Sequence, residues 1–145
     1  MIVKAILDKC VDLSQTDLTG YGPLLASLPH KNPILLQQLL QRGANPNERE
    51  WGGTTPLLVA TNHQFHAGIK LLLDFGADVD YSRCGDTALT LAVQRGDIIA
   101  VELLLNHGAG SKAGLSQALI DQANKARDFE IAALLETALE RHQED

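Results

Sequence analysis

A repeat with a period of 32 to 33 residues constrains the fold of this chain more than any other feature. A Leu-Leu pair is separated by two residues from a following Gly-Ala, and the pair and its glycine recur with steps of 33 and then 32 residues. The glycines of this motif are Gly43, Gly76 and Gly108. A second motif, which starts at Pro23-Leu24 and recurs at Pro56-Leu57 and Ala88-Leu89, keeps the same two steps. Two motifs in one register predict a solenoid of stacked units.

The sequence of each unit predicts a short helix, a turn that reverses the chain, a longer helix and a residue that ends this helix. Thr55 and Thr87 stand where an N-cap is expected, because a threonine hydroxyl can accept an orphan amide bond of the first turn. Pro56 follows at the first helical position, where its missing N–H costs nothing. The repeated glycines are expected to end the second helices in the left-handed conformation.

Apolar residues recur at helical spacing and predict which face of each helix is buried. The first helices are expected to turn inward Leu57, Ala60, Leu89 and Ala92. The second helices carry an apolar stripe formed by Ile69, Leu72, Leu73, Val101, Leu104 and Leu105.

These motifs resemble those of the ankyrin-repeat family, with its Thr-Pro-Leu-His opening and its leucine-rich second helix that ends in Gly-Ala-Asp. The match is best over 55–80, next over 87–110, recognisable over 22–47, and covers nearly the whole chain. The resemblance implies an all-α solenoid of helix-turn-helix units joined by β-turn or loop tips. The family's histidine is replaced by Leu25, Leu58 and Thr90. Its side-chain hydrogen bond is therefore expected to be absent, and the turns less rigid than in a consensus repeat.

We expect a single domain over 1–145 with irregular terminal repeats. It divides into an N-terminal half repeat (1–20), three repeats (21–53, 54–85 and 86–112) and a degenerate C-terminal capping repeat (113–145). The half repeat places Val3, Ile6 and Leu7 on a helix without its usual partner. That face either packs on the next repeat or is covered by a second copy or another protein. In the last repeat, apolar residues are expected to form a final helix pair: Leu119, Ile120, Ala123, Ile131, Leu134 and Leu135.

Composition narrows the partners and the compartment. The formal net charge is −6, which disfavours nucleic acid and favours encounters with a basic protein surface. No apolar run is long enough for a membrane span, and no signal peptide is evident, so no membrane role is expected. Cys10 and Cys84 are too few for a disulfide framework, which suits the cytoplasm. Glu136, Glu140 and Glu144 form an acidic ridge, either a solvated capping face or a contact for a basic partner.

In the ankyrin family, partner contacts usually come from the loop tips and the exposed faces of the first helices, on the concave side. Carried over position by position, the resemblance implies a partner-binding set of Tyr21, His30, Arg49, Trp51, Asn62, His63, Tyr81, Arg83, Asp86 and Arg95. Trp51 is the strongest candidate, because it is the only tryptophan and lies in a loop beside Gly52-Gly53. Tryptophan is enriched in binding hot spots. The alternative is that Trp51 packs over the neighbouring turn.

The leading hypothesis is a non-enzymatic module, without a cofactor, that binds a folded partner as an inhibitor, an immunity-type or sequestering protein, or an adaptor. It is expected to act as a monomer. One alternative is a structural protein that self-assembles, as a dimer or larger, through its N-terminal helix. The least favoured is a metal protein at His63 and His66, whose spacing can bring two imidazoles together but provides no third ligand. Gly52-Gly53 is followed by no phosphate-loop signature.

Overall fold

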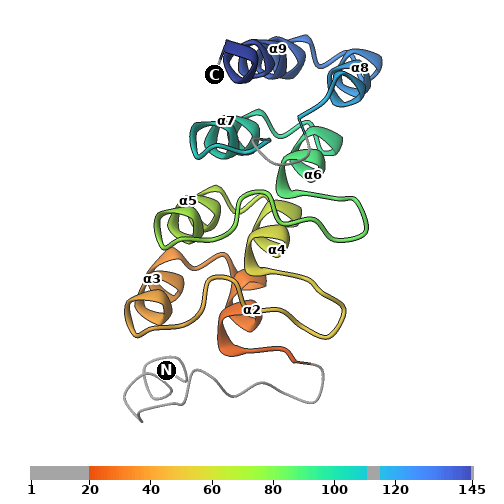
Figure 1. Cartoon of the computed structure of the whole chain (residues 1–145). Coiled ribbons are helices and arrows are strands. Elements are labelled where there is room, and N and C mark those ends of the chain that lie inside the picture. Colours follow the sequence, from red (N-terminus) through yellow and green to blue (C-terminus); the bar gives the residue numbers. More distant parts are fainter. Residues whose placement is uncertain (1–19, 111–114, 145) are drawn as a thin grey trace. The chain divides into compact units, whose positions relative to one another are not determined.

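The computed structural model describes residues 20–110 and 115–144, and every described regular element is a helix. The prediction of an all-α fold built from helix-turn-helix units is therefore confirmed over these residues (Figure 1). The chain divides into two compact units, Met1–Ala77 and Asp78–Asp145. The expectation of a single domain with five segments stays a prediction. The expected N-terminal helix with Val3, Ile6 and Leu7, like Cys10, lies outside the described residues.

The first unit contains two stacked helix pairs. The first pair consists of α2 (Pro23–Ser27), extended by the short 3-10 helix η1 (Leu28–His30), and α3 (Pro33–Gln41). The second pair consists of α4 (Pro56–Asn62) and α5 (His66–Asp74). The pairs stack because α3 packs against α5, while α4 packs against η1 and α2.

The second unit repeats this arrangement. Its pairs are α6 (Ala88–Gln94) with α7 (Ile98–Asn106), and α8 (Gln117–Lys125) with α9 (Phe129–Glu144). α6 packs against α8, and α7 packs against α9. α9 has 16 residues where α7 has 9, so the last helix continues well beyond the length of its equivalent.

The helix ends form where the local sequence predicts them. Thr55 and Thr87 are N-caps. The Thr55 hydroxyl accepts a hydrogen bond from the amide of Leu58, and the Thr87 hydroxyl accepts one from the amide of Thr90, each the third residue of its helix. Gly43, Gly76 and Gly108 follow α3, α5 and α7 with φ of 95°, 93° and 86°. A non-glycine residue rarely adopts this conformation, which explains why glycine recurs at this position.

The histidine position behaves differently in the two units. In α6, the Thr90 hydroxyl accepts a hydrogen bond from the Thr87 amide (2.8 Å), and the Thr87 hydroxyl accepts one from the Thr90 amide. This reciprocal capping box means that a side-chain hydrogen bond is present where we expected none. The expectation was wrong at this residue because a threonine hydroxyl is itself able to accept the bond from the N-cap amide. Leu25 and Leu58 are buried aliphatic side chains.

The core consists of the predicted apolar stripes, with two exceptions. Leu57, Ala60, Leu89 and Ala92 are buried on the first helices, as are Ile69, Leu72, Leu73, Val101 and Leu104 on the second. Leu105 and Leu134 are only half-buried, and both line a shallow open pocket of about 430 Å³ between α7 and α9. Leu105 was expected on the inward stripe, but it lies at the edge of the α7–α9 contact. No helix in the described ranges is both long and apolar enough to span a bilayer.

Candidate functional site

The loop between α3 and α4 presents Trp51 on a tight, hydrogen-bonded turn. The Glu50 carbonyl accepts a hydrogen bond from the Gly53 amide (2.8 Å), so Trp51 and Gly52 occupy the two central positions of a four-residue turn. The Glu50 amide donates to the Thr54 carbonyl (3.3 Å), and the Thr54 hydroxyl donates to the Glu50 carboxylate. Gly53 has a φ of 81°, which favours glycine there. The turn is therefore built from its own backbone and side-chain contacts.

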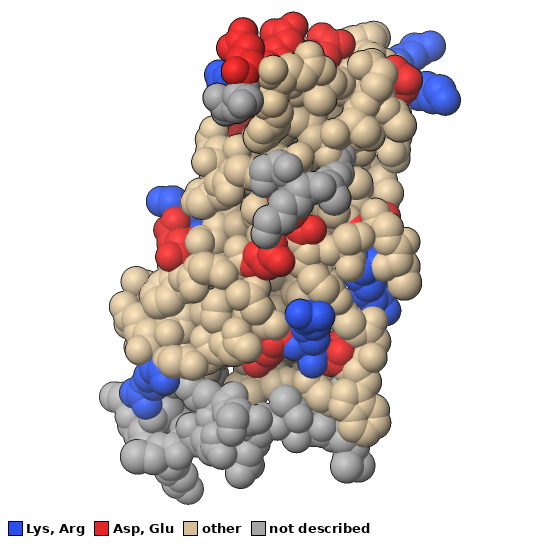
Figure 2. Space-filling model, viewed as in Figure 1, with Lys and Arg blue, Asp and Glu red and all other residues tan. Residues whose placement is uncertain are grey.

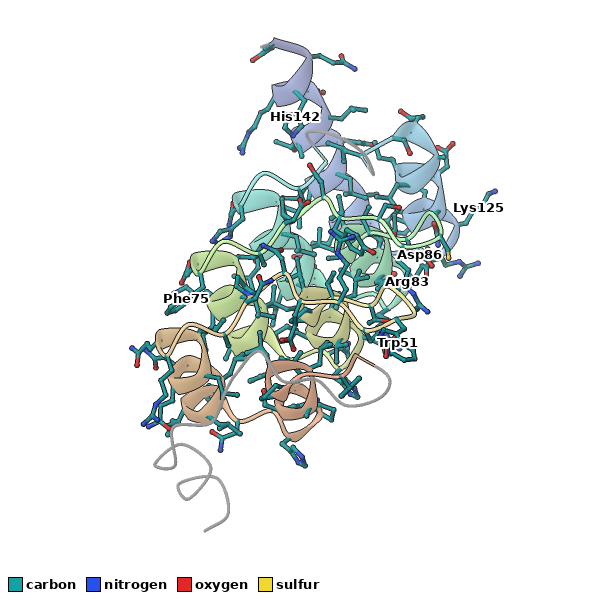
Figure 3. All side chains as sticks on the ribbon, turned by 60° about the horizontal axis from the view of Figure 1, so that its bottom comes forward. Trp51, Phe75, Arg83, Asp86, Lys125 and His142 are labelled. Atoms are coloured by element: carbon teal, nitrogen blue, oxygen red, sulfur yellow. The ribbon has the colours of Figure 1, made fainter. Side chains whose placement is uncertain are left out.

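Trp51 is 81% exposed, so its indole is not a core side chain. One edge of the ring does lie against Gly20, in the segment before α2, because a Cβ built on Gly20 would be 2.8 Å from the indole Cδ1. In Figure 3 the side chain stands on the loop and clear of the helices of its unit. The packing interpretation therefore describes one edge of the ring, while most of the indole surface remains accessible to a partner.

The first unit separates the sequence-predicted site residues into two groups. Tyr21, Arg49 and Trp51 lie in the loops that lead into α2 and α4, so they belong to the N-terminal ends of these helices; Tyr21 is half-buried and Arg49 exposed. His30, Asn62 and His63 lie at the opposite, C-terminal ends. His30 and Asn62 are exposed, whereas His63 is half-buried as the C-cap of α4.

The second unit carries a hairpin turn at the equivalent place. The backbones of Arg83 and Asp86 exchange two hydrogen bonds of 2.9 Å, and Cys84 and Gly85 between them have φ of 53° and 93°. Two central residues with positive φ are typical of a type I′ turn, whose twist suits a tight hairpin. Arg83 and Asp86 are exposed on this turn before α6, as Figure 3 also shows.

The other two candidates of the second unit lie outside the turn. Tyr81 is half-buried just before the hairpin. Arg95 is exposed as the C-cap of α6, at the opposite end of that helix from the Arg83–Asp86 turn. Each unit therefore presents a tip at the N-terminal ends of its first helices and a second group at their C-terminal ends.

Glu48, which the sequence places on the loop beside Arg49, belongs to the site of the first unit through a contact that sequence reasoning missed. Its Oε1 accepts a hydrogen bond from the amide of Leu25 (2.9 Å), the third residue of α2. Burial raises the pKa of the Glu48 carboxyl above its ordinary value, and the hydrogen bond from Leu25 opposes part of that shift. One sequence signal could have found it: the N-cap position that Thr55 and Thr87 occupy is Gly22 in α2, which has no side chain to make the bond.

Figure 2 shows charged side chains of both signs on the face drawn, and acidic side chains gather on the end of the second unit where α9 lies. Glu136, Glu140 and Glu144 are all exposed on α9, so the ridge predicted from their spacing is accessible to solvent. Whether that ridge is only a solvated face or a contact for a basic partner stays open.

The histidine pair has little to support a metal site. His63 is the C-cap of α4 and His66 begins α5, and both are half-buried. Within residues 20–110 and 115–144, no three or more histidine, cysteine, aspartate or glutamate residues are grouped so that they could hold a metal ion. Cys84 is an exposed free thiol on the hairpin turn.

Comparison with known proteins agrees with this geometry. A family model described as ankyrin repeats (3 copies) matches residues 24–114. The chain is 38% identical to the human photoreceptor ankyrin repeat protein over 94 residues, which are 61% of this chain and 21% of that protein. It is 33% identical to a B-cell lymphoma 3 protein homolog of Mus musculus over 103 residues (67% of this chain, 23% of that protein). A putative ankyrin repeat protein of Rickettsia bellii is 33% identical over 118 residues (74% and 33%).

The chain thus spans between about a fifth and a third of the length of these relatives. The shared part is the repeat array, with its capped first helices, its glycine stops and its loop tips. Ankyrin repeats generally mediate interactions between proteins and are generally not enzymes. The matched model covers more than half of the sequence and extends over the first three helix pairs, so this chain belongs to the ankyrin-repeat family.

Proposed function

We propose that this protein is a non-enzymatic binding module that grips a folded partner protein through its loop tips, with Trp51 as the main anchor. The observation that carries the proposal is the combination of an 81% exposed indole with a turn that is closed by its own hydrogen bonds. Exposed aromatic rings are costly to keep in water, and tryptophan is the residue type most enriched where alanine substitution weakens an interface.

The second tip supports the same function with different chemistry. Arg83 and Asp86 provide an exposed cation and an exposed anion on a hairpin whose backbone bonds limit its freedom. A turn that is ordered before binding loses less conformational entropy in the complex. The candidates at the C-terminal ends of the first helices, His30, Asn62, His63 and Arg95, would extend the contact of each unit along its exposed helix faces.

The net charge of −6 favours a partner with a basic surface, because opposite charges accelerate the encounter. We propose that the protein acts as a monomer in the cytoplasm, and that it occupies its partner as an inhibitor, an immunity-type or sequestering protein, or an adaptor. The exposed Cys84 thiol suits a reducing compartment.

The test is an affinity capture from extract of the native cells, with the wild-type chain, Trp51→Ala, Arg83→Ala and the double variant as baits. Phe129→Ala and Arg141→Ala are matched controls, because Phe129 is a 67% exposed aromatic residue and Arg141 an exposed arginine, and neither lies on a loop tip. We expect a protein that the wild type and both controls capture and that the tip variants lose. Equal capture by wild type and tip variants would contradict the proposed surface and direct attention to α9 or to the N-terminal segment.

A further inference from the structure

The turn that carries Trp51 is closed by local bonds, and local bonds alone do not fix where the turn points relative to the helices. Three contacts join the turn and the residues before it to the rest of the first unit. Glu48 bonds the Leu25 amide of α2, Asn47 donates its side-chain amide to the Gly76 carbonyl after α5 (3.0 Å), and Gly20 lies against the Trp51 indole. The segment just before Trp51 is therefore attached to the helix pair on either side of it.

The Glu48 contact takes the place of a missing N-cap. In α4 and α6 the amide of the third helical residue is bonded by the threonine N-cap of the same helix. In α2 the N-cap is Gly22, which makes no side-chain bond, and the amide of the third residue is bonded by a carboxylate 23 residues further along the chain. A local cap would stabilise only its own helix, whereas this bond also attaches the loop that leads to Trp51.

Gly22 provides the space for this contact. A Cβ built on Gly22 would lie 2.7 Å from Oε2 of Glu48, closer than real Cβ contacts come, and 3.0 Å from its Cδ, so the Glu48 carboxylate would have to move. The backbone of Gly22 has φ of −83° and ψ of 172°, which any residue can adopt. The absence of a side chain therefore matters for the room it leaves to the Glu48 carboxylate and not for backbone freedom.

We propose that Glu48 is a positioning residue of the Trp51 site: its bond to the Leu25 amide holds the Trp51 turn in one orientation before any partner binds. This inference rests on the proposed function, because it concerns how the same site is prepared. The Cδ1 edge of the indole lies against Gly20, and the residue is 81% exposed, so most of the ring faces outward to solvent. The partner chemistry that fits a fixed, outward indole is an apolar recess on a folded protein, since neither side then needs to be ordered on binding.

The test needs no partner, because Trp51 is the only tryptophan and its fluorescence reports on this turn alone. Time-resolved fluorescence anisotropy of the full chain measures the local motion of the indole on the nanosecond scale. Two variants remove the contact in different ways: Glu48→Ala deletes the carboxylate, and Gly22→Ala leaves Glu48 in the sequence but displaces it. Glu48→Gln keeps an oxygen that can accept the Leu25 bond, and Glu136→Ala removes an equally charged, exposed residue of α9.

We expect Glu48→Ala and Gly22→Ala to gain a fast depolarisation component that the wild type, Glu48→Gln and Glu136→Ala lack. Far-UV circular dichroism shows whether each variant is folded, and if Glu48→Ala is not, Gly22→Ala decides. Hydrogen exchange of the Leu25 amide, which should become faster in both contact variants, confirms that the bond has been lost.

The proposal is overturned if the Leu25 amide exchanges faster in folded Glu48→Ala or Gly22→Ala while the anisotropy decay stays that of the wild type. Glu48 would then cap α2 without positioning Trp51. Failure of both variants to fold would also overturn it, since Glu48 would be a requirement for folding and not for the orientation of one turn. Because none of these readouts involves a partner, a failed affinity capture and a failed anisotropy test remain distinguishable.

Discussion

Oε1 of Glu48 accepts a hydrogen bond of 2.9 Å from the backbone amide of Leu25, and this bond joins the loop before Trp51 to the first turn of α2. The carboxylate performs for α2 what the hydroxyl of Thr55 performs for α4, but it reaches the helix from a different part of the chain. A helix cap and the position of a surface loop are thereby linked in one contact.

The burial of Glu48, which outweighs its bond to Leu25, predicts an unusual dependence of stability on pH. Burial raises the pKa of Glu48 above its ordinary value of 4.5, so the folded chain binds this proton more tightly than the unfolded chain. Protonation of Glu48 therefore stabilises the folded chain, and this contribution is complete below the pKa of the unfolded chain. It is lost as pH rises through the raised pKa of the folded chain. At neutral pH the folded chain keeps a partly desolvated charge.

We expect Glu48→Gln to gain stability relative to the wild type as pH rises from about 4 to about 7, because the amide oxygen keeps the Leu25 bond without a charge. Urea unfolding of both proteins at each pH measures the difference, in which the other titrating groups cancel. A difference that is constant with pH, or that favours the wild type at neutral pH, would contradict the raised pKa.

Leu72 tests the core of the first unit. Its side chain is fully buried on α5, so Leu72→Ala leaves a cavity and is expected to lower the free energy of unfolding by about 2–5 kcal/mol. Ile34→Ala is the matched control, since Ile34 is 67% exposed on α3 and its truncation should cost little. Chemical denaturation followed by circular dichroism gives both values, and equal costs for the two variants would contradict the assigned core.

The capping box of α6 makes a separate prediction. Thr87→Ala removes the hydroxyl that the Thr90 amide binds, and the expected loss of stability is roughly 1 kcal/mol, within the usual range for an N-cap. Thr87→Ser keeps the hydroxyl and should retain most of that stability. A serine variant as unstable as the alanine variant would show that the methyl group of Thr87, which is buried, matters more than its hydrogen bond.

Trp51 should affect binding and leave stability almost unchanged. Truncation of an anchor residue typically weakens an interface by about 2 kcal/mol or more, so Trp51→Ala should reduce the affinity for the captured partner at least about thirtyfold. Its melting temperature should stay close to that of the wild type, because the indole is 81% exposed. Titration calorimetry and a thermal melt give the two quantities. A large fall in melting temperature would instead assign Trp51 a structural role.

Most of the fold follows from patterns that act over a few residues. Thr55 and Pro56 define the start of α4, and Gly76 follows the end of α5, because caps and left-handed stops depend on local backbone geometry. Helical spacing of leucine and alanine correctly indicated the buried faces, since a face that repeats every turn must lie against its neighbours. The period of the two motifs indicated how the pairs stack within each unit.

The site depends on contacts that such patterns do not contain. The loop position of Trp51 was evident from the sequence, but its exposure depends on how the Gly20 tip meets its indole edge. The half-buried state of Leu105 depends on α9, more than 20 residues away in the chain. The bond from Glu48 to Leu25 requires a loop to fold back across the helix pair, and only the empty N-cap at Gly22 hints at it. Sequence alone determined the helices and their stacking because these follow from periodic, short-range interactions. The tertiary structure decided which loop residues are held in place and which are exposed, because those properties arise from contacts between segments far apart in the chain.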